Sequence, residues 1–119
     1  MSKDDMSKLI FPCSGAADVG NIADLTARKL TKEGTGRMFC MAGIGGNVEK
    51  IIRITREASK ILAIDGCPLN CVKSSLQRAG FDNFEHFTVT NLGMKKGSTS
   101  VTDENVATVK AKAEVLLRD

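Results

Sequence analysis

The sequence predicts an α/β fold, in which a single domain holds a mostly parallel four-stranded sheet between two layers of helices. Two observations lead to this prediction. Short apolar segments alternate along the chain with longer segments whose apolar residues recur at helical spacing. The segment 60–66 is β-branched and apolar almost throughout, which is typical of a strand buried on both faces. The resulting order βαβαβαβα favours a parallel sheet with helices on both sides.

The first strand is expected at 8–13, a short apolar segment that contains a proline near its end. The first helix is expected from Asp18 to Leu30, and Gly34 offers a stop. Its inward face is predicted to hold Val19, Ile22, Ala23, Thr26 and Leu30. The second strand is expected at 36–42, where it runs into the glycine-rich turn "GIGG".

Asn47 is predicted to cap the second helix, which runs to about Ser59. One side of that helix is predicted to carry Val48, Ile51, Ile52 and Thr55. After the third strand at 60–66, Pro68 is predicted to be the first residue of the third helix, because its missing N–H has no partner in a first turn anyway. Gly80 is expected to end this helix. Its apolar stripe is predicted to consist of Leu69, Val72, Leu76 and Ala79.

The fourth strand is expected at 84–91, and the turn-like segment 92–100 follows it. Thr102 is predicted to cap the last helix. The inward residues of that helix are predicted to be Val106, Val109, Ala113 and Leu116. These elements suit a Rossmann- or flavodoxin-like sheet with strand order 2-1-3-4, formed by one domain over 1–119 whose first residues, 1–7, are expected to be flexible.

Composition and charge exclude several classes of function. With 119 residues, 42% hydrophobic and 26% charged, the chain suits one globular domain. The net charge of +3 is spread along the sequence, and the lack of Trp and Tyr removes the usual base-stacking platforms, so we expect no nucleic-acid partner. No apolar segment approaches the roughly 20 residues of a membrane span, and the charged start lacks a signal peptide. We therefore expect a cytoplasmic protein without membrane contact.

Four cysteines carry the main functional signal. In the cytoplasm thiols are kept reduced, so four of them in a domain of this size point to metal or thiol chemistry, not to structural disulfides. Cys13, Cys40 and Cys67 fall at or just past the ends of the first three strands, and Cys71 lies in the first turn of the next helix. Because parallel strands end at one edge, we expect the four thiols to gather where open α/β sheets bind ligands.

The predicted geometry suits a metal ion, and Zn²⁺ in particular. Three helices begin at this edge, and their positive ends favour the thiolate form. Cys67 is the expected N-cap, and Cys71, four residues on, shares its helix face, so the pair can present two sulfurs to one ion. Zinc takes four such ligands at about 2.3 Å. Cys40 must reach across the end of the first strand to join them; otherwise it is a spare thiol beside a three-sulfur site. We expect Cys67 to be the most reactive thiol and the strand-like Cys40 the least.

At the level of motifs, the segments "PCSGAADVGNIA", "CMAGIGG" and "AIDGCPLNC" closely resemble the DGC-domain family, named for an Asp-Gly-Cys motif that is here Asp65-Gly66-Cys67. The resemblance extends to "LGMKKG" and covers nearly the whole chain. It implies a zinc-binding protein in which Cys13, Cys40, Cys67 and Cys71 are the proposed metal ligands. It implies no particular reaction.

Three hypotheses of function therefore remain open. The first is a zinc-binding carrier, sensor or structural module. The second is a thiol-based enzyme that uses the same cysteines for redox chemistry or sulfur transfer, so whether the protein is an enzyme is undecided. The third is an iron–sulfur protein, since four cysteines can also hold a cluster. The "GIGG" segment could bind phosphate through its N–H groups, but without a Walker lysine we interpret it as a tight turn.

Other polar residues near the thiols have two interpretations each. Asp65 could orient a ligand from behind or cap the helix that follows. Ser14, also considered as support for the ligands, is expected to bond to the loop backbone. His86 is interpreted as an ordinary strand residue, not a ligand. Lys95 and Lys96 could offset the charge of the thiolates or lie in a solvated loop.

Overall fold

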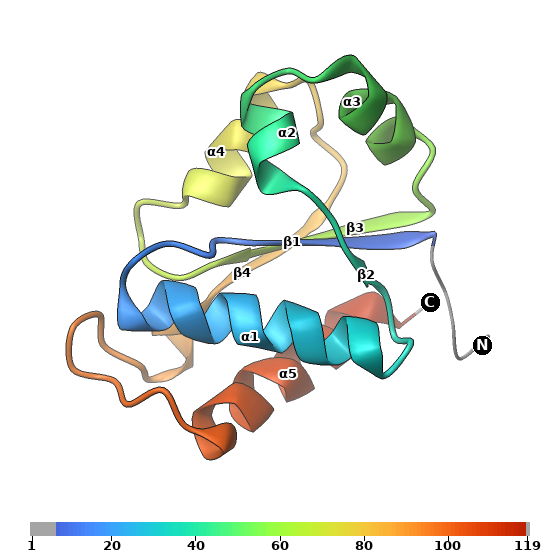
Figure 1. Ribbon diagram of the computed structural model, residues 1–119. Helices are drawn as coiled ribbons and strands as arrows, with labels where there is room; N and C mark the ends of the chain where they lie inside the picture. The colour runs from blue at the N-terminus through green and yellow to red at the C-terminus, as the bar shows by residue number, and fades with distance from the viewer. Residues whose placement is uncertain (1–6, 119) are drawn as a thin grey trace.

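Four parallel strands form the centre of the molecule, with helices on both sides (Figure 1). The structure is a computed structural model that describes residues 7–118. Its elements are β1 (Lys8–Pro12), α1 (Asp18–Lys32), β2 (Arg37–Met38), α2 (Met41–Gly45), α3 (Glu49–Arg56), β3 (Lys60–Asp65), α4 (Cys71–Arg78), β4 (Glu85–Thr88), the 3-10 helix η1 (Val89–Leu92) and α5 (Asp103–Leu117). The strand order β2-β1-β3-β4 confirms the predicted order. Helices α1 and α5 cover one face of the sheet, and α2, α3 and α4 cover the other, which confirms the three-layer fold.

Each face of the sheet has its own apolar core. Side chains of a strand point alternately to opposite faces. In β1, Ile10 packs into the cluster on the α1/α5 side, whereas Leu9 and Phe11 pack into the cluster on the α2/α3/α4 side. In β3, Leu62 packs into the cluster on the α1/α5 side and Ala63 into the cluster on the α2/α3/α4 side. The prediction that the strand at 60–66 is buried on both faces is confirmed, and β1 is buried in the same way.

The apolar faces predicted for the first and last helices are largely confirmed. All five residues assigned to the inward face of α1 are buried. In α5 three of the four predicted residues are buried, and Leu116 is partly buried against the same core cluster. Thr102 caps α5 as expected, since its Oγ1 accepts a hydrogen bond of 3.1 Å from the backbone N–H of Asn105.

The second strand was predicted to span 36–42, and this prediction is wrong beyond Met38, where β2 ends. The chain leaves the sheet at Phe39, and α2 occupies most of the segment that was assigned to the end of a strand and a glycine turn. Gly43 allows α2 to pack against α3, because a Cβ at this position would come 2.6 Å from Cγ1 of Ile51. A short apolar run fits a buried helix as well as a strand, which is why periodicity misassigned it.

The start of α3 also differs from the prediction. Asn47 does not cap the helix; it adopts a left-handed conformation with φ 55°, which asparagine tolerates better than most residues. Val48 is the N-cap residue instead, and its side chain is 49% exposed, not part of the buried face. The helix ends at Arg56, before the expected Ser59.

The third predicted helix begins later than expected. Neither Cys67 as N-cap nor Pro68 as first residue is correct: α4 begins at Cys71, after Asn70 in a left-handed conformation with φ 52°. Leu69, assigned to the apolar stripe, is 71% exposed because it lies in the loop before the helix. Cys67 and Cys71 therefore do not share a helix face.

The fourth strand is shorter than the predicted 84–91. Its pairing with β3 ends at Thr88, and the next residues turn into η1. The backbone N–H of Thr90 donates to the carbonyl of Gly66 at 3.2 Å. Strand β4 thus leads directly to the loop that follows β3.

At the opposite edge of the sheet, two lysines tie the strands to the end of α5. Lys8 is 1% exposed, and its Nζ donates to the carbonyl oxygen of Leu117 at 2.6 Å. Lys60 Nζ donates to the carbonyl oxygen of Arg118 at 2.5 Å. Cations at a helix C-terminus are favourable, because the last carbonyls lack partners within the helix.

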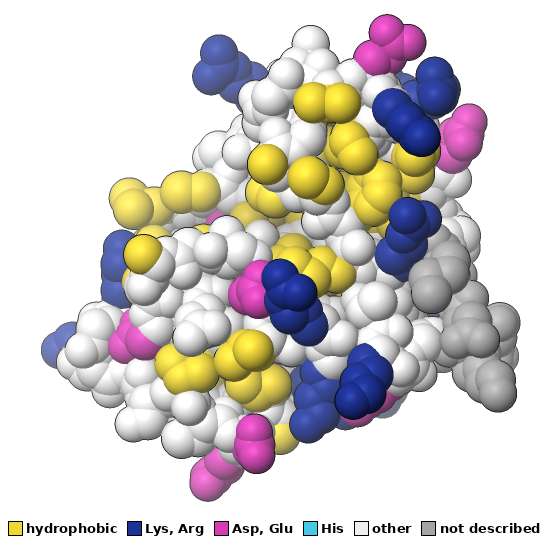
Figure 2. Space-filling model, in the orientation of Figure 1, with side chains coloured by type: hydrophobic (Ala, Val, Ile, Leu, Met, Phe, Trp, Pro, Cys, Tyr) yellow, Lys and Arg dark blue, Asp and Glu magenta, His cyan; other side chains and the backbone are white. Residues whose placement is uncertain are grey.

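The surface shows no dense basic block on the face drawn in Figure 2, where Lys and Arg side chains alternate with acidic and neutral ones. Within residues 7–118, no helix is long and apolar enough to cross a membrane.

The first seven residues were expected to be flexible. Of these, the structure describes only Ser7, and residues 1–6 lie outside the described part of the chain. Ser7 Oγ lies 2.7 Å from Ser59 Oγ.

Candidate functional site

All four cysteines lie at the carboxyl edge of the sheet, as the alternation of elements predicted. Cys13 directly follows β1, Cys40 follows β2 by two residues, Cys67 follows β3 by two residues, and Cys71 begins α4. The described part of the chain contains all four, each as a free thiol. Their role as metal ligands stays a prediction.

Cys13 is fixed by its backbone. Its N–H donates to the carbonyl oxygen of Ile64 at 2.9 Å, which continues the β1–β3 pairing by one residue. The half-buried side chain packs against the core clusters of both faces. A Cβ on Gly15 would lie 3.2 Å from Cys13 Sγ, so the loop after Cys13 turns closely past its sulfur.

Three glycines bring two cysteine-bearing loops against the first turn of α1. A Cβ on Gly66 would lie 2.9 Å from the backbone N of Gly20, and a Cβ on Gly20 would lie 2.9 Å from the backbone N and O of Gly15. These are contacts between backbones, which cannot move aside as a side chain could. The loops that carry Cys13 and Cys67 are therefore packed onto one helix start.

A fourth segment, 93–99, lies over the same helix start. The Asp18 carboxylate accepts hydrogen bonds from the backbone N–H of Gly97 at 2.9 Å and of Thr99 at 3.0 Å. These bonds, that of Gly97 foremost, hold the pKa of Asp18 below its usual range. The anchored segment places Lys96 Nζ at 3.6 Å from Cys67 Sγ, in a hydrogen bond to the sulfur.

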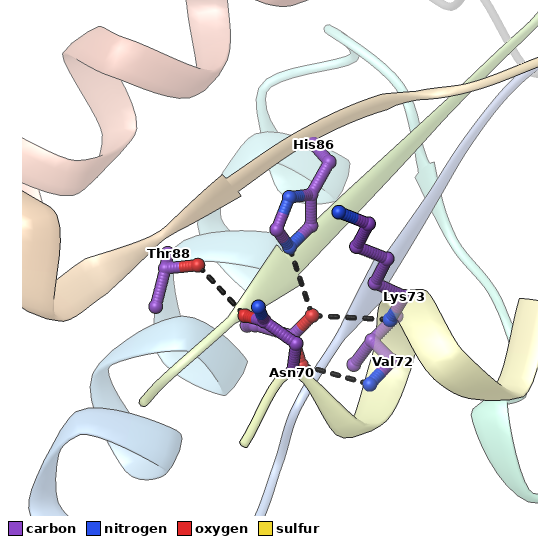
Figure 3. A network of polar contacts seen from close by, with 6 residues as sticks. Asn70, Val72, Lys73, His86 and Thr88 are labelled. Atoms are coloured by element: carbon purple, nitrogen blue, oxygen red, sulfur yellow. Dashed lines mark hydrogen bonds and ion pairs between the residues drawn. The ribbon is translucent and has the colours of Figure 1, made fainter. Parts of the chain in front are cut away.

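Asp65 of the Asp-Gly-Cys motif caps α4 from the end of β3, and its partners Val72, Lys73 and His86 are labelled in Figure 3. Its side chain is 1% exposed. The two carboxylate oxygens accept hydrogen bonds from the backbone N–H of Val72 at 2.8 Å and of Lys73 at 3.0 Å. His86 Nε2 lies 2.9 Å from the second oxygen. Of the two roles left open for Asp65, the capping role is the one for which the structure provides contacts.

A second polar contact in Figure 3 joins the loop between Cys67 and Cys71 to β4. Thr88 Oγ1 donates to Asn70 Oδ1 at 2.9 Å. The backbone N–H of Asn70 donates to the carbonyl of Cys67 at 3.1 Å. The left-handed Asn70 then turns the chain into α4, so the loop is held at both ends.

Ser14 does not bond to the loop backbone as expected. It has a left-handed conformation with φ 54°, and its Oγ donates to Asp24 Oδ1 at 2.6 Å. Arg28 Nε donates to the other oxygen of Asp24 at 2.7 Å. Burial raises the pKa of Asp24, but the hydrogen bonds from Arg28 and Ser14 outweigh it and leave that pKa lowered. Ser14 thus anchors the first cysteine loop to α1.

The four thiols form two pairs with different surroundings. Cys13 and Cys67, the inner pair, are half-buried and pack against the core cluster of the α1/α5 face. Cys40 and Cys71, the outer pair, are exposed at the starts of α2 and α4 on the other face of the sheet. Cys40 is the N-cap residue of α2 and not part of a strand, so the premise for its low expected reactivity is wrong.

The chemistry of the donors fits zinc, but their arrangement is not that of a finished site. Four thiols are the ligand set of many zinc sites. Among residues 7–118, however, no group of three or more His, Cys, Asp or Glu side chains lies close enough together to hold a metal ion. The sheet edge brings the cysteines to one region without closing them around a common centre.

Two residues at this edge have roles that the sequence did not indicate. His86 was interpreted as an ordinary strand residue, yet it contacts the buried carboxylate of Asp65 from the neighbouring strand. Asp18 was seen only as a helix start, yet it holds a segment about 80 residues further along the chain. The positive φ of Gly97, 87°, marks the tight turn that makes this contact possible.

Comparison with known proteins gives one family. Residues 9–113 match the sequence profile of the DGC domain. The anaerobic and virulence modulator AnvM of Pseudomonas aeruginosa is 40% identical over 95 residues, which cover 80% of this chain and 72% of AnvM. No solved structure matches the chain.

Proposed function

The chain belongs to the DGC-domain family, and from this membership we propose that it is a zinc-binding protein whose ligands are Cys13, Cys40, Cys67 and Cys71. The observation that carries the proposal is that four free thiols lie at the carboxyl edge of one parallel sheet. Thiolate sulfur is a preferred zinc ligand.

In this proposal the metal is exchangeable and does not hold the fold together. Both faces of the sheet have an apolar core of buried strand and helix side chains, against which Cys13 and Cys67 pack only partly buried. Among residues 7–118, the thiols are also not gathered around one centre. Zinc binding then requires the exposed outer pair to move toward the inner pair, which suits a carrier or a sensor better than a structural module.

The role of sensor has some support from the relative. AnvM is named a modulator, and its name refers to anaerobic conditions. We extend this to the present chain as a regulatory role that depends on the state of the thiols. Thiolates that are accessible to solvent oxidise readily, and oxidation releases a bound metal.

The test is elemental analysis of protein purified without added metal, together with an absorption spectrum. We expect about one zinc per chain. The zinc should be lost when Cys67 or Cys71 is replaced by Ser, because each substitution removes one of the proposed sulfur ligands. Cys40→Ser distinguishes two arrangements: loss of zinc indicates four sulfurs, whereas retained zinc indicates three sulfurs and an open position. Ser74→Ala, at an exposed position of α4, is the matched control.

Two results would overturn zinc as the metal. Visible absorption with bound iron would assign an iron–sulfur cluster in its place. A colourless protein whose four thiols titrate freely, even after zinc is supplied, would leave the thiol-based enzyme as the remaining hypothesis.

A chelator separates an exchangeable site from a structural one. We expect the helices and strands to persist after zinc removal, with faster amide exchange only around 13–16, 40–46 and 65–71. In a small zinc module the binding energy of the metal is the folding energy, so such a protein unfolds on chelation. Global unfolding here would assign the zinc a structural role.

The second candidate function, a thiol-based enzyme, is favoured by one specific contact. The ammonium of Lys96 lies 3.6 Å from Cys67 Sγ, which places a cation directly beside one of the thiols. In that case Cys67 is the nucleophile and the outer pair supplies a resolving thiol. Loss of activity toward a disulfide or persulfide substrate in Cys67→Ser, in metal-free protein, would identify this function.

A further inference from the structure

Segment 93–99 holds its lysine in a defined place at the thiol site. Met94 is buried in the core cluster of the α1/α5 face, and Asp18 accepts two hydrogen bonds from the same segment. Thr99 closes the turn internally, since its Oγ1 accepts from the N–H of Lys95 at 2.8 Å and donates to its carbonyl at 2.6 Å. Lys96 is therefore carried by a turn that is anchored at three points.

The positive charge of Lys96 remains available to a ligand. In the described part of the chain, no carboxylate forms an ion pair with Lys96, whose ammonium contacts Cys67 Sγ. The carboxylate next to this segment, Asp18, is already occupied by backbone N–H groups. The N-terminus of α1 adds partial positive charge at the same place.

We infer that Lys96 determines which partners Cys67 accepts, and that it selects small anionic ligands and electrophiles over neutral ones of the same shape. This inference rests on the proposed function in one respect, namely that Cys67 acts as a thiol ligand or nucleophile. An approaching anion meets the sulfur and the ammonium together, whereas a neutral molecule gains nothing from the ammonium. At about 4 Å in water, one unit charge attracts another strongly enough for a roughly fivefold preference.

The test compares two alkylating reagents that differ in charge. Iodoacetate is anionic and iodoacetamide is neutral, and both react alike: the sulfur forms a bond to carbon, the carbon–iodine bond breaks, iodide leaves with the electron pair, and the thiol proton passes to the buffer. The rate at Cys67 is read by mass spectrometry of its peptide in metal-free protein. The ratio of the two rates cancels changes in burial or in the fraction of thiolate, which affect both reagents equally.

We expect Lys96→Met to lower the ratio of the iodoacetate rate to the iodoacetamide rate about fivefold. Lys96→Arg should retain the ratio, because it keeps the charge. Lys95→Met is the matched control: it removes a neighbouring exposed charge whose side chain has no contact with Cys67, and it should leave the ratio unchanged. In wild-type protein, salt at about 1 M should remove most of the preference, since it shortens the screening length to about 3 Å.

An unchanged ratio in Lys96→Met, or an equal fall in Lys95→Met, would overturn the inference. These outcomes are independent of zinc, because the measurement uses metal-free protein and reports on Cys67 alone. A protein that binds no zinc can still show the charge preference, and one that binds zinc can lack it. The zinc content of the same variants, measured separately, shows which of the two proposals has failed.

Discussion

The inner pair and the outer pair of cysteines occupy the same sheet edge but are held in opposite ways. Cys13 and Cys67 lie in loops whose backbones touch the start of α1 through Gly15, Gly20 and Gly66. Cys40 and Cys71 are exposed residues at the starts of short helices. One half of the site is therefore positioned by the fold, and the other half lies at the surface.

This difference indicates how such a site can bind and release a soft ligand. The inner pair offers two sulfurs whose places are fixed before any ligand arrives, which lowers the entropic cost of binding. The side chains of the outer pair are exposed and so have room to approach or withdraw. A site built in this way exchanges its ligand faster than one in which all four sulfurs are embedded in the core.

Removing the carboxylate of Asp65 is expected to have the largest effect on stability. Asp65→Ala leaves two backbone N–H groups of α4 and the His86 ring without their acceptor, so we expect a loss of about 2–4 kcal/mol in the free energy of unfolding, measured with urea. Asp24→Ala removes a partly exposed ion pair and should cost about 1 kcal/mol or less. Equal losses would mean that Asp65 does not support the outer pair.

A methyl group on Gly66 tests the rigidity of the inner pair. The Cβ in Gly66→Ala would collide with the backbone of Gly20 at 2.9 Å, and neither partner can give way, so we expect a loss of about 2 kcal/mol by urea unfolding. Gly45→Ala is the matched control, because nothing lies within 4 Å of its added Cβ and alanine favours helix. If Gly66→Ala is as stable as Gly45→Ala, the loops are not packed as described.

A neutral alkylating reagent should distinguish the pairs kinetically. In metal-free protein we expect Cys40 and Cys71 to react severalfold faster than Cys13, because they are exposed at helix starts whereas Cys13 packs against both cores. This replaces the order expected from the sequence, in which Cys40 was last. Mass spectrometry of the four peptides at several times measures the rates. Cys13 reacting first would show that the first loop opens readily.

The smallest expected effect concerns the pH dependence of Asp18. The folded pKa of this carboxyl lies below the ordinary value of 3.8 for aspartate, mainly through the N–H of Gly97 and then of Thr99. A lowered folded pKa contributes stability that is present above about pH 4 and is lost as the pH falls through the folded pKa. The amide shifts of Gly97 and Thr99 should change over this range by NMR. In Asp18→Asn the titration should be absent, and its persistence would assign the change to another group.

The sequence predicted the parts of the fold that depend on periodicity. The burial of the strand at 60–66 on both faces and the apolar stripe of α1 follow from the type and spacing of side chains. The strand order came from the likeness of the alternating elements to Rossmann- and flavodoxin-like sheets. Periodicity failed at 36–42 because the short apolar run 38–42 fits either a strand end or a short helix. The segment forms a helix that packs closely against α3 at Gly43 and Ile51, and such a contact between elements leaves no trace in the local spacing of residues.

The contacts within the site could not be predicted from the sequence, for a similar reason. The start of α4 was misplaced because its cap is Asp65, supplied from β3 and not from the residue before the helix. The contacts of His86 and Lys96 join segments 21 and 29 residues apart. Local propensity carries no information on such contacts, whereas the location of the cysteines at strand ends could be deduced from topology.

The contact of Lys8 with Leu117 has a consequence for the synthesis of the protein. The two residues are 109 positions apart, and Lys8 is almost fully buried in the first strand. A ribosome that has made only β1 to β4 carries a sheet whose α1 side lacks the cover of α5, and its first strand lacks the carbonyl of residue 117. The last steps of folding must therefore wait until translation has passed the end of α5, and a chain stalled shortly before that point should be a substrate for chaperones and proteases.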